Sequence, residues 1–144
     1  MTIKLDISPL ENATNQIEQS LNYYHSDLAK QDPGLALQLR AASIQAFEFT
    51  YELCWKMLKR YLEISAPSLN NVDALAFPEL IRSAAEQGLL LHGWPQWKIY
   101  REARNIISHT YNQAKAKQVM EIIPQFLEEA KYLSAQLANR IVQS

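Results

Sequence analysis

Apolar side chains recur along most of the chain at alternating spacings of three and four residues, which is the pattern of amphipathic α-helices. In the N-terminal segment, residues 8–11 (Ser-Pro-Leu-Glu) have the residue order of a capping box, with Ser8 at the N-cap. Asp-Pro-Gly at residues 32–34 marks its end. We therefore predict a first helix from Ser8 to just before this turn. Its apolar positions are Leu10, Ala13, Ile17, Leu21, Tyr24 and Leu28.

The second segment, residues 35–64, has a broader apolar face. Such a face predicts a helix with neighbours on several sides, as in the centre of a bundle. Residues 66–71 are predicted as a loop. The main apolar stripe consists of Ile44, Phe47, Tyr51, Cys54, Leu58 and Tyr61, and an adjoining stripe consists of Phe49, Leu53 and Met57.

The positions of proline and glycine predict three further helices. A short helix opens at residues 77–80 and ends near Gln87, because Gly88 is available as a terminator. The next begins near Pro95 and runs toward Ile107. A long helix after Asn112 contains Pro124, which predicts a kink and not a break, because the apolar period continues.

The predicted fold class is all-α, an up-and-down antiparallel helical bundle of four main helices plus a short extra helix. Residues 1–144 are expected to form one domain, since a chain of 144 residues can bury a sufficient core. No alternation typical of strands and no internal repeat is present in the sequence.

Composition limits the possible functions. Fourteen Lys and Arg against fifteen Asp and Glu give a formal charge of -1, which does not indicate a broad cationic surface for nucleic acid but leaves room for a local basic site. Three glycines exclude the usual glycine-rich phosphate loops. With one cysteine, no secretion signal and no apolar run long enough for a membrane span, we expect a cytoplasmic protein with no membrane association.

Several possible site residues have simpler structural interpretations. Glu48 and Glu52 stand one turn apart, yet Glu-x-x-His pairs are missing and Lys56 is a simple ion-pair partner for Glu52, so we expect no metal. His25 and His92 lack ligands at metal-binding spacing and are expected at the surface or at helix ends. Cys54 lies on an apolar stripe and is expected to be a small buried hydrophobe.

The densest group of chemically active residues lies in the segment 97–111, at the end of the helix that is predicted to begin near Pro95. Arg104 offers a planar fork of donors suited to phosphate, His109 can move a proton near neutral pH, and Asn105 can orient either group. This set suffices for metal-free phosphodiester cleavage, in which a ribose 2'-hydroxyl attacks the neighbouring phosphate.

Helix geometry constrains this pair. Residues five apart on a regular helix are rotated by about 140° and separated by about 7.5 Å along the axis. Either the helix unwinds before His109, or a second copy completes the site across a two-fold interface, and we favour a composite dimer site. In the structural alternative, Arg104 pairs with a helix acid and His109 caps the helix C-terminus.

The residues from Arg104 to His109 (Arg-Asn-Ile-Ile-Ser-His) resemble the motif of HEPN domains. Extension to Tyr111 gives Arg-x4-His-x-Tyr, which is similar to HepT toxins encoded beside a minimal nucleotidyltransferase (MNT) antitoxin. Residues 47–56 and 101–111 also resemble the nucleotidyltransferase substrate-binding proteins.

This resemblance implies a HEPN-like helical bundle that forms a homodimer with Arg104 and His109 of both subunits at the interface. It implies the toxin of a type VII-like toxin–antitoxin pair, a metal-independent endoribonuclease that needs no cofactor and acts on RNA. It further implies that the MNT antitoxin neutralises the toxin by transferring AMP to Tyr111, which would obstruct the RNA phosphate sterically and by charge.

The same resemblance leaves a second possibility open. The chain is then a non-catalytic substrate-binding or docking subunit of a nucleotidyltransferase complex, with Arg104 and His109 contacting a nucleotide. The near-neutral formal charge favours this alternative mildly.

Overall fold

The computed structural model describes residues 4–65, 76–109 and 112–141, and the chain forms six α-helices within these ranges. This confirms the predicted all-α fold class. The helices are α1 (Ser8–Tyr24), α2 (Asp27–Gln31), α3 (Pro33–Ser65), α4 (Phe77–Glu86), α5 (Trp94–His109) and α6 (Gln113–Arg140).

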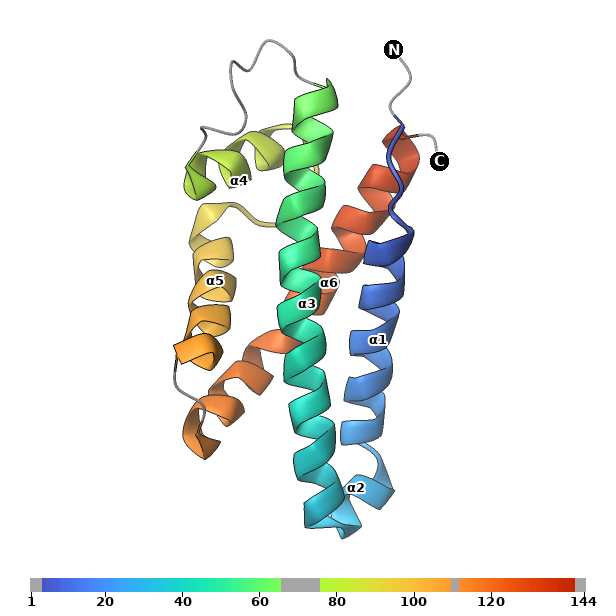
Figure 1. The fold of residues 1–144 in the computed structure, drawn as a ribbon, viewed down its shortest axis with the longest axis vertical. Coiled ribbons are helices and arrows are strands. Elements are labelled where there is room, and N and C mark those ends of the chain that lie inside the picture. Colours follow the sequence, from blue (N-terminus) through green and yellow to red (C-terminus); the bar gives the residue numbers. More distant parts are fainter. Residues whose placement is uncertain (1–3, 66–75, 110–111, 142–144) are drawn as a thin grey trace.

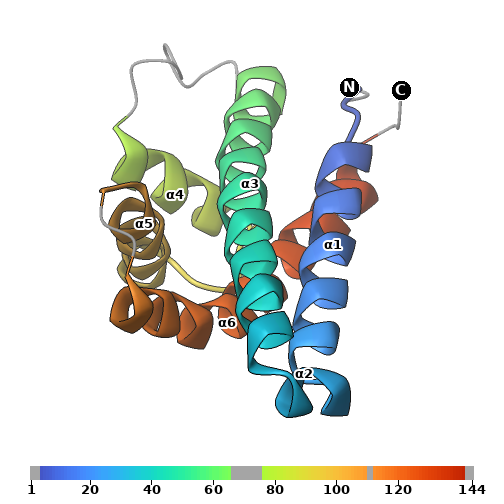
Figure 2. The same cartoon turned by 60° about the horizontal axis from the view of Figure 1, so that its bottom comes forward.

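The four long helices alternate in direction, as an up-and-down bundle requires (Figure 1). α3 occupies the centre, between α1 on one side and α4 with α5 on the other, while α6 crosses behind it from α5 toward α1 (Figures 1 and 2). α3 contacts each of the other helices, which confirms its predicted central position. The short α2 closes the end of the molecule opposite α4 (Figure 1).

The start of α1 differs from the predicted capping box. Ser8 is the first helical residue, Ile7 is the N-cap, and no side chain caps the helix there. The backbone N–H of Ser8 instead donates to Asp6 Oδ1 at 3.0 Å. Ile7 is completely buried, so core packing sets where the chain enters the helix and overrides the capping signal.

The first predicted helix is divided in two. α1 ends at Tyr24, and Ser26 Oγ accepts a hydrogen bond from the backbone N–H of Ala29 at 3.2 Å, which caps the short α2. A serine that bonds the backbone in this way competes with helix continuation. The prediction of one helix through Leu28 was therefore wrong, and the Leu28 side chain is 65% exposed.

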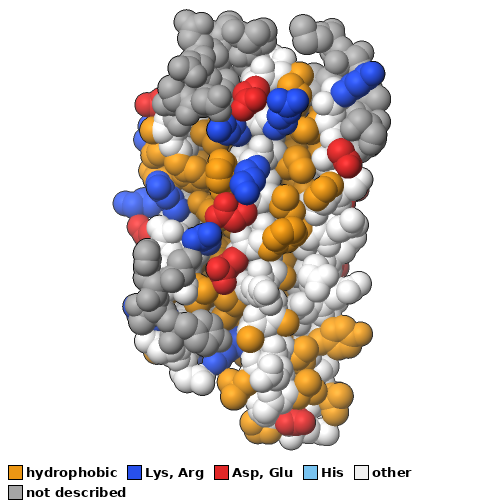
Figure 3. Space-filling view, viewed as in Figure 1, with side chains coloured by type: hydrophobic (Ala, Val, Ile, Leu, Met, Phe, Trp, Pro, Cys, Tyr) orange, Lys and Arg blue, Asp and Glu red, His pale blue; other side chains and the backbone are white. Residues whose placement is uncertain are grey.

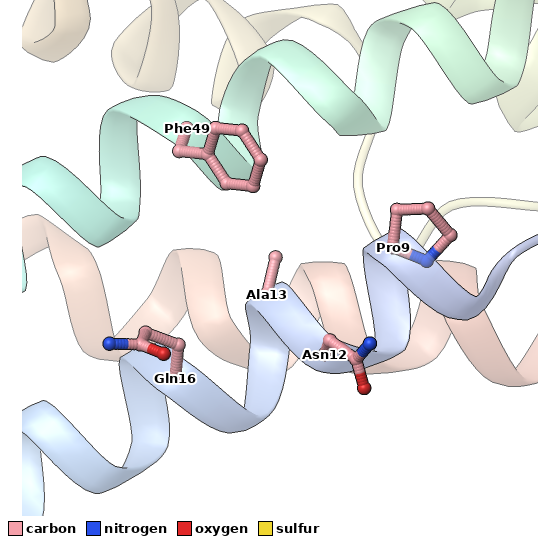
Figure 4. A pocket seen from close by; sticks show the side chains of 5 residues that line it. All are labelled: Pro9, Asn12, Ala13, Gln16 and Phe49. Atoms are coloured by element: carbon pink, nitrogen blue, oxygen red, sulfur yellow. The ribbon is translucent and has the colours of Figure 1, made fainter.

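The predicted apolar stripes of α3 are buried or partly buried except at Phe49. Leu53 and Met57 pack against the core, but Phe49 is 60% exposed. α1 approaches this side of α3 through the small side chain of Ala13, which leaves the Phe49 ring above a groove (Figure 4). The prediction that Phe49 lies on a buried face was wrong.

The remaining boundaries agree closely with the sequence pattern. Gly88 ends the α4 segment with a φ of 77°, a conformation that glycine adopts without strain. α5 starts one residue before Pro95, and α6 remains one helix through Pro124, as predicted. The loop predicted at residues 66–71 lies outside the described residues.

An aromatic cluster joins α5 to α3 and α6. The ring of Phe126 lies 5.0 Å from that of Phe47 and 5.2 Å from that of Tyr100, both in edge-to-face geometry. Trp97 packs edge-on to Tyr100 at 5.3 Å. Trp97 and Tyr100 are fully buried, so this cluster fixes which face of α5 turns away from the core.

Side chains of α6 also hold the connection between α4 and α5. Arg140 Nη1 donates to the carbonyl of Gln87 at 2.7 Å, and Tyr132 Oη donates to the carbonyl of Gly88 at 3.2 Å. The fully buried Glu129 accepts from the backbone N–H of Leu91 at 2.6 Å. In the part of the chain that the structure describes, none of the helices has the length and apolarity of a membrane span.

Candidate functional site

A hollow of about 220 Å³ lies between α3, α4 and α5 and contains two of the residues predicted from sequence, Arg104 and Asn105. α5 contributes a further arginine, and α3 and α4 supply aromatic rings and a carboxylate. The lining residues are Tyr51, Glu52, Trp55, Phe77, Arg101, Arg104 and Asn105.

The orientation of α5 places the two arginines here. Its buried stripe contains Trp97, Tyr100 and Ala103, which face the core. Arg101 and Arg104 are three residues apart, so they are neighbours on the helix surface beside that stripe. The packing that secures α5 therefore also directs both guanidinium groups to the same hollow.

Glu52 holds Arg104 in an ion pair between α3 and α5. Arg104 Nη2 lies 3.1 Å from Glu52 Oε1, and both side chains are 31% exposed. The other oxygen, Glu52 Oε2, accepts a hydrogen bond from Trp55 Nε1 at 3.0 Å. Trp55, Glu52 and Arg104 thus form a chain of polar contacts along the wall of the hollow.

This arrangement corrects one prediction. Among the described residues Glu52 forms no ion pair with Lys56, whose Nζ instead lies 5.8 Å from the centre of the Trp55 ring. The turn-to-turn spacing predicted a local pair, but Trp55 holds the carboxylate toward α5. Pairing of Arg104 with a helix acid, the structural alternative above, is what the structure has.

Burial and nearby charges act in opposite directions on the pKa values of side chains at and near the hollow. Burial raises the pKa of Glu48, and the nearby charge of Arg104 opposes this rise. Burial also raises the pKa of Tyr51 well above its usual range, against the opposing charge of Arg101, so its phenol stays protonated at neutral pH. The guanidinium of Arg101 lies 5.1 Å from the centre of the Phe77 ring, a cation–π distance.

The structure excludes one of the two ways of bringing Arg104 and His109 together. Unwinding of the helix before His109 does not occur, because α5 continues through this residue. Along a regular helix the two residues diverge by about 140°. The His109 side chain and all of Tyr111 lie outside the described parts of the chain, so their predicted roles stay predictions.

The other candidate residues have structural roles. His25 is exposed and terminates α1, as predicted. Cys54 is completely buried, and burial raises the pKa of its thiol, which confirms its interpretation as a hydrophobe. His92 lies at the surface, but its Nδ1 is 3.1 Å from Oε1 of the buried Glu129, a contact that the sequence did not predict. Across residues 4–65, 76–109 and 112–141, no three His, Cys, Asp or Glu side chains are grouped to hold a metal.

A larger hollow, about 410 Å³, lies between α1 and α3 (Figure 4). Proline, alanine and phenylalanine line it together with two uncharged amides, and the Phe49 ring projects over it from α3 (Figure 4). None of the lining residues carries a charge or a titratable group. This groove therefore does not supply the predicted phosphodiester chemistry. Its lining residues are Pro9, Asn12, Ala13, Gln16 and Phe49.

The face of the molecule seen in Figure 3 has no broad area of one charge. Lys and Arg side chains alternate with Asp and Glu side chains along its middle, next to apolar side chains (Figure 3). This agrees with the formal charge of -1 and with a basic site that is local.

Sequence reasoning found Arg104 and Asn105 but missed the residues of α3 and α4 that complete the hollow. Glu52 and Trp55 are spaced three apart, which indicates only that they are neighbours on one helix. Arg101, one turn before Arg104, was the available signal for a second cation. Contact between α3 and α5 depends on tertiary packing, which helical periodicity does not determine.

The sequence and the helical bundle are both similar to those of a known family. The family model described as nucleotidyltransferase substrate binding protein like matches residues 5–139. The chain belongs to this family, which confirms the resemblance drawn from residues 47–56 and 101–111.

A curated protein and a solved structure, both from Haemophilus influenzae, are similar to nearly the whole chain. A protein named probable ribonuclease HepT is 37% identical over 142 residues, which is 97% of this chain and 97% of that protein. A solved structure, described as the fold of a substrate binding domain of a nucleotidyltransferase, matches with a TM-score of 0.81 and 35% identity. That match covers 92% of this chain and 99% of the other.

Proposed function

We propose that this protein is the toxin of a type VII-like toxin–antitoxin pair, a HEPN-type endoribonuclease that cleaves RNA without a metal. The observation that carries the proposal is the position of Arg104 at the hollow between α3 and α5, with Arg101 and Asn105 beside it. The similarity to a protein named probable ribonuclease HepT supports it.

The proposed reaction is an internal transfer at phosphorus. The ribose 2'-oxygen forms a bond to the neighbouring phosphorus while the bond from phosphorus to the 5'-oxygen breaks, leaving a 2',3'-cyclic phosphate and a 5'-hydroxyl. His109 handles protons, since the 2'-hydroxyl loses one and the departing oxygen gains one. Arg104 stabilises the charge that develops on the phosphoryl oxygens, and Asn105 orients the phosphate.

We further propose that the active form is a homodimer with a composite site. The support is geometric, because α5 stays helical through His109 and a single regular helix directs Arg104 and His109 apart. A two-fold interface across the α3 and α5 faces brings the residues of two copies together. Phe49, 60% exposed one turn before Glu52, offers apolar surface for that interface.

Regulation follows from Tyr111, two residues after His109. We propose that an MNT antitoxin transfers AMP from ATP to the Tyr111 oxygen, with release of pyrophosphate. The adenylate adds bulk and negative charge beside the site and repels the RNA phosphate. The family description, which refers to a nucleotidyltransferase substrate, supports a nucleotidyltransferase as partner.

The Arg104–Glu52 ion pair favours a second candidate function. A carboxylate that already neutralises Arg104 weakens its attraction for phosphate, as suits a non-catalytic subunit that binds a substrate or docks onto a nucleotidyltransferase. The description of the solved relative as a substrate binding domain points the same way.

Expression of the protein alone in a bacterial host separates the two candidates. We expect growth arrest with the wild-type chain, relief by Arg104→Ala or His109→Ala, and relief by co-expression of the proposed MNT antitoxin. Normal growth with the wild-type chain alone, at an expression level verified by immunoblot, supports the binding subunit and contradicts the toxin.

A further inference from the structure

The hollow beside Arg104 has two kinds of wall. Aromatic rings come from α3 and α4, namely Trp55 and Phe77, while cations and an amide come from α5. The groove between α1 and α3 is larger, but only Phe49 is aromatic there and its lining has no cation. Rings next to guanidinium groups are the combination by which proteins bind unpaired nucleotides, since bases stack on rings and phosphates bind to arginines.

Trp55 is partly exposed and held in one orientation, as a ring that stacks on a base needs to be. Its Nε1–H donates to Glu52 Oε2 at 3.0 Å, which orients the indole, and the residue is only half-buried. Lys56 Nζ lies over the ring, 5.8 Å from its centre, and this flexible cation also attracts phosphate when a base displaces it from the ring.

Arg101 is the second cation that lines the hollow. The residue is exposed, and its guanidinium lies 5.1 Å from the centre of the Phe77 ring. That contact confines a long side chain to the rim of the hollow and leaves the donors of its planar fork for a ligand. Arg101 forms no salt bridge within the described residues, whereas Arg104 shares its charge with Glu52.

We propose that this hollow binds one unpaired nucleotide of the RNA next to the cleaved bond, with its base against Trp55 and its phosphate at Arg101. The proposal rests on the proposed function and adds to it a base-binding subsite formed by Trp55 and Arg101. A base inside a duplex has both faces covered by its neighbours and is not available to Trp55. Free nucleotides have the same chemistry, so the test compares both sources.

The test measures binding to the full-length His109→Ala protein, which does not consume the RNA. The probes are a fluorescein-labelled ten-nucleotide oligouridylate, the same strand annealed to oligoadenylate, and free AMP as competitor, with Kd read from fluorescence anisotropy. We expect tighter binding of the single strand than of the duplex, and displacement by AMP only at far higher concentrations. AMP binding as tight as that of the oligonucleotide, or a preference for the duplex, overturns the proposal.

Four substitutions in this background assign the subsite. Trp55→Leu removes the ring and is expected to raise the Kd for the single strand about 5- to 100-fold, while Trp55→Phe keeps an aromatic face and retains most of the affinity. Arg101→Ala is expected to weaken binding and to lower the slope of log Kd against log salt by about 0.7. Lys30→Ala, on α2 at the opposite end of the molecule from α4, removes one exposed charge away from the hollow and leaves the affinity unchanged.

The outcomes distinguish this proposal from the proposed function. An effect of Trp55→Phe equal to that of Trp55→Leu means that Trp55 acts only by holding Glu52, which overturns the stacking role. Equal effects of Arg101→Ala and Lys30→Ala overturn the phosphate contact. If the wild-type protein cleaves RNA while the Trp55 and Arg101 variants bind normally, the subsite is wrong and the ribonuclease stands. If these variants bind weakly but the wild-type protein does not cleave, the subsite stands and the ribonuclease is wrong.

Discussion

Arg104 of α5 and Glu52 of α3 form an ion pair at 3.1 Å in which both side chains are about one-third exposed. Exposed pairs of this kind contribute about 0.2–1 kcal/mol, because water and salt screen them. An RNA phosphodiester, whose single negative charge is shared by two oxygens, can bind the guanidinium in bidentate geometry and competes well against such a partner. We interpret Glu52 as a positioning residue that keeps Arg104 at the hollow and releases it to the substrate.

Glu52→Gln tests this interpretation. The amide keeps an oxygen for Trp55 Nε1 but no longer attracts Arg104 by charge, so we expect up to about fivefold tighter binding of RNA. The matched control is Glu63→Gln, which removes the partner of Arg60 at 3.6 Å on the same helix. Anisotropy titrations that give equal changes for the two variants contradict a specific role for Glu52.

Phe49→Glu tests the proposed dimer face. A charge on a side chain that is 60% exposed leaves the fold of one chain intact but is costly inside an apolar interface. We expect sedimentation velocity to show a shift from dimer to monomer and RNA cleavage to fall with it. Leu28→Glu, at a residue of α2 that is 65% exposed, is the control and stays dimeric. A Phe49→Glu protein that remains a dimer at the same concentration places the interface elsewhere.

Glu129 makes the stability of the fold dependent on pH. Burial raises the pKa of this carboxyl, while the Leu91 N–H and His92 oppose the rise. A carboxyl whose folded-state pKa is raised stabilises the fold most in acid, and this contribution is lost as the pH increases through that pKa. Glu129→Gln does not ionise and escapes the loss.

Urea unfolding of both proteins between about pH 4 and pH 8 measures this difference. We expect the free energy of unfolding of Glu129→Gln, relative to wild type, to increase with pH. A difference that is constant across the range contradicts an ionisable role for Glu129. Glu129→Ala leaves the partly buried Leu91 N–H without its acceptor and is expected to be less stable than Glu129→Gln by about 1–3 kcal/mol at every pH, because neither side chain ionises.

Tyr111 is the proposed point of control. After incubation with the proposed MNT antitoxin and ATP, we expect intact-mass spectrometry to show the addition of AMP and RNA cleavage to stop. Tyr111→Phe keeps the ring but lacks the oxygen that accepts AMP, so it is expected to gain no mass and to escape inactivation. Equal mass gain in Tyr111→Phe assigns the modification to another residue.

The fold was largely predictable because helical periodicity and the turn residues are local signals. Gly88 and Pro95 marked their boundaries correctly. The errors arose where tertiary packing or a side chain competed with those signals, as Ile7 did at the start of α1 and Ser26 did at its end. Within the candidate site, Arg104 could be predicted from its residue type and from its spacing to His109.

The partners of Arg104 were not predictable. Glu52 is distant in sequence, and its nearest cation along α3 is Lys56. Only the packing of α5 against α3, fixed by the buried Trp97 and Tyr100, turns that carboxylate into the partner of Arg104. The sequence nevertheless indicated such a pair in general terms, through the alternative that Arg104 binds a helix acid.

Incubation of the purified protein with RNA in excess EDTA tests whether Arg104 and His109 cleave RNA without a metal. We expect fragments with 2',3'-cyclic phosphate and 5'-hydroxyl ends, and a loss of at least about 100-fold in rate for His109→Ala and for Arg104→Ala. Circular dichroism of both variants establishes that the bundle is intact. Cleavage that continues unchanged in either folded variant, or that the wild-type protein performs only when a divalent metal is added, contradicts metal-independent catalysis by Arg104 and His109.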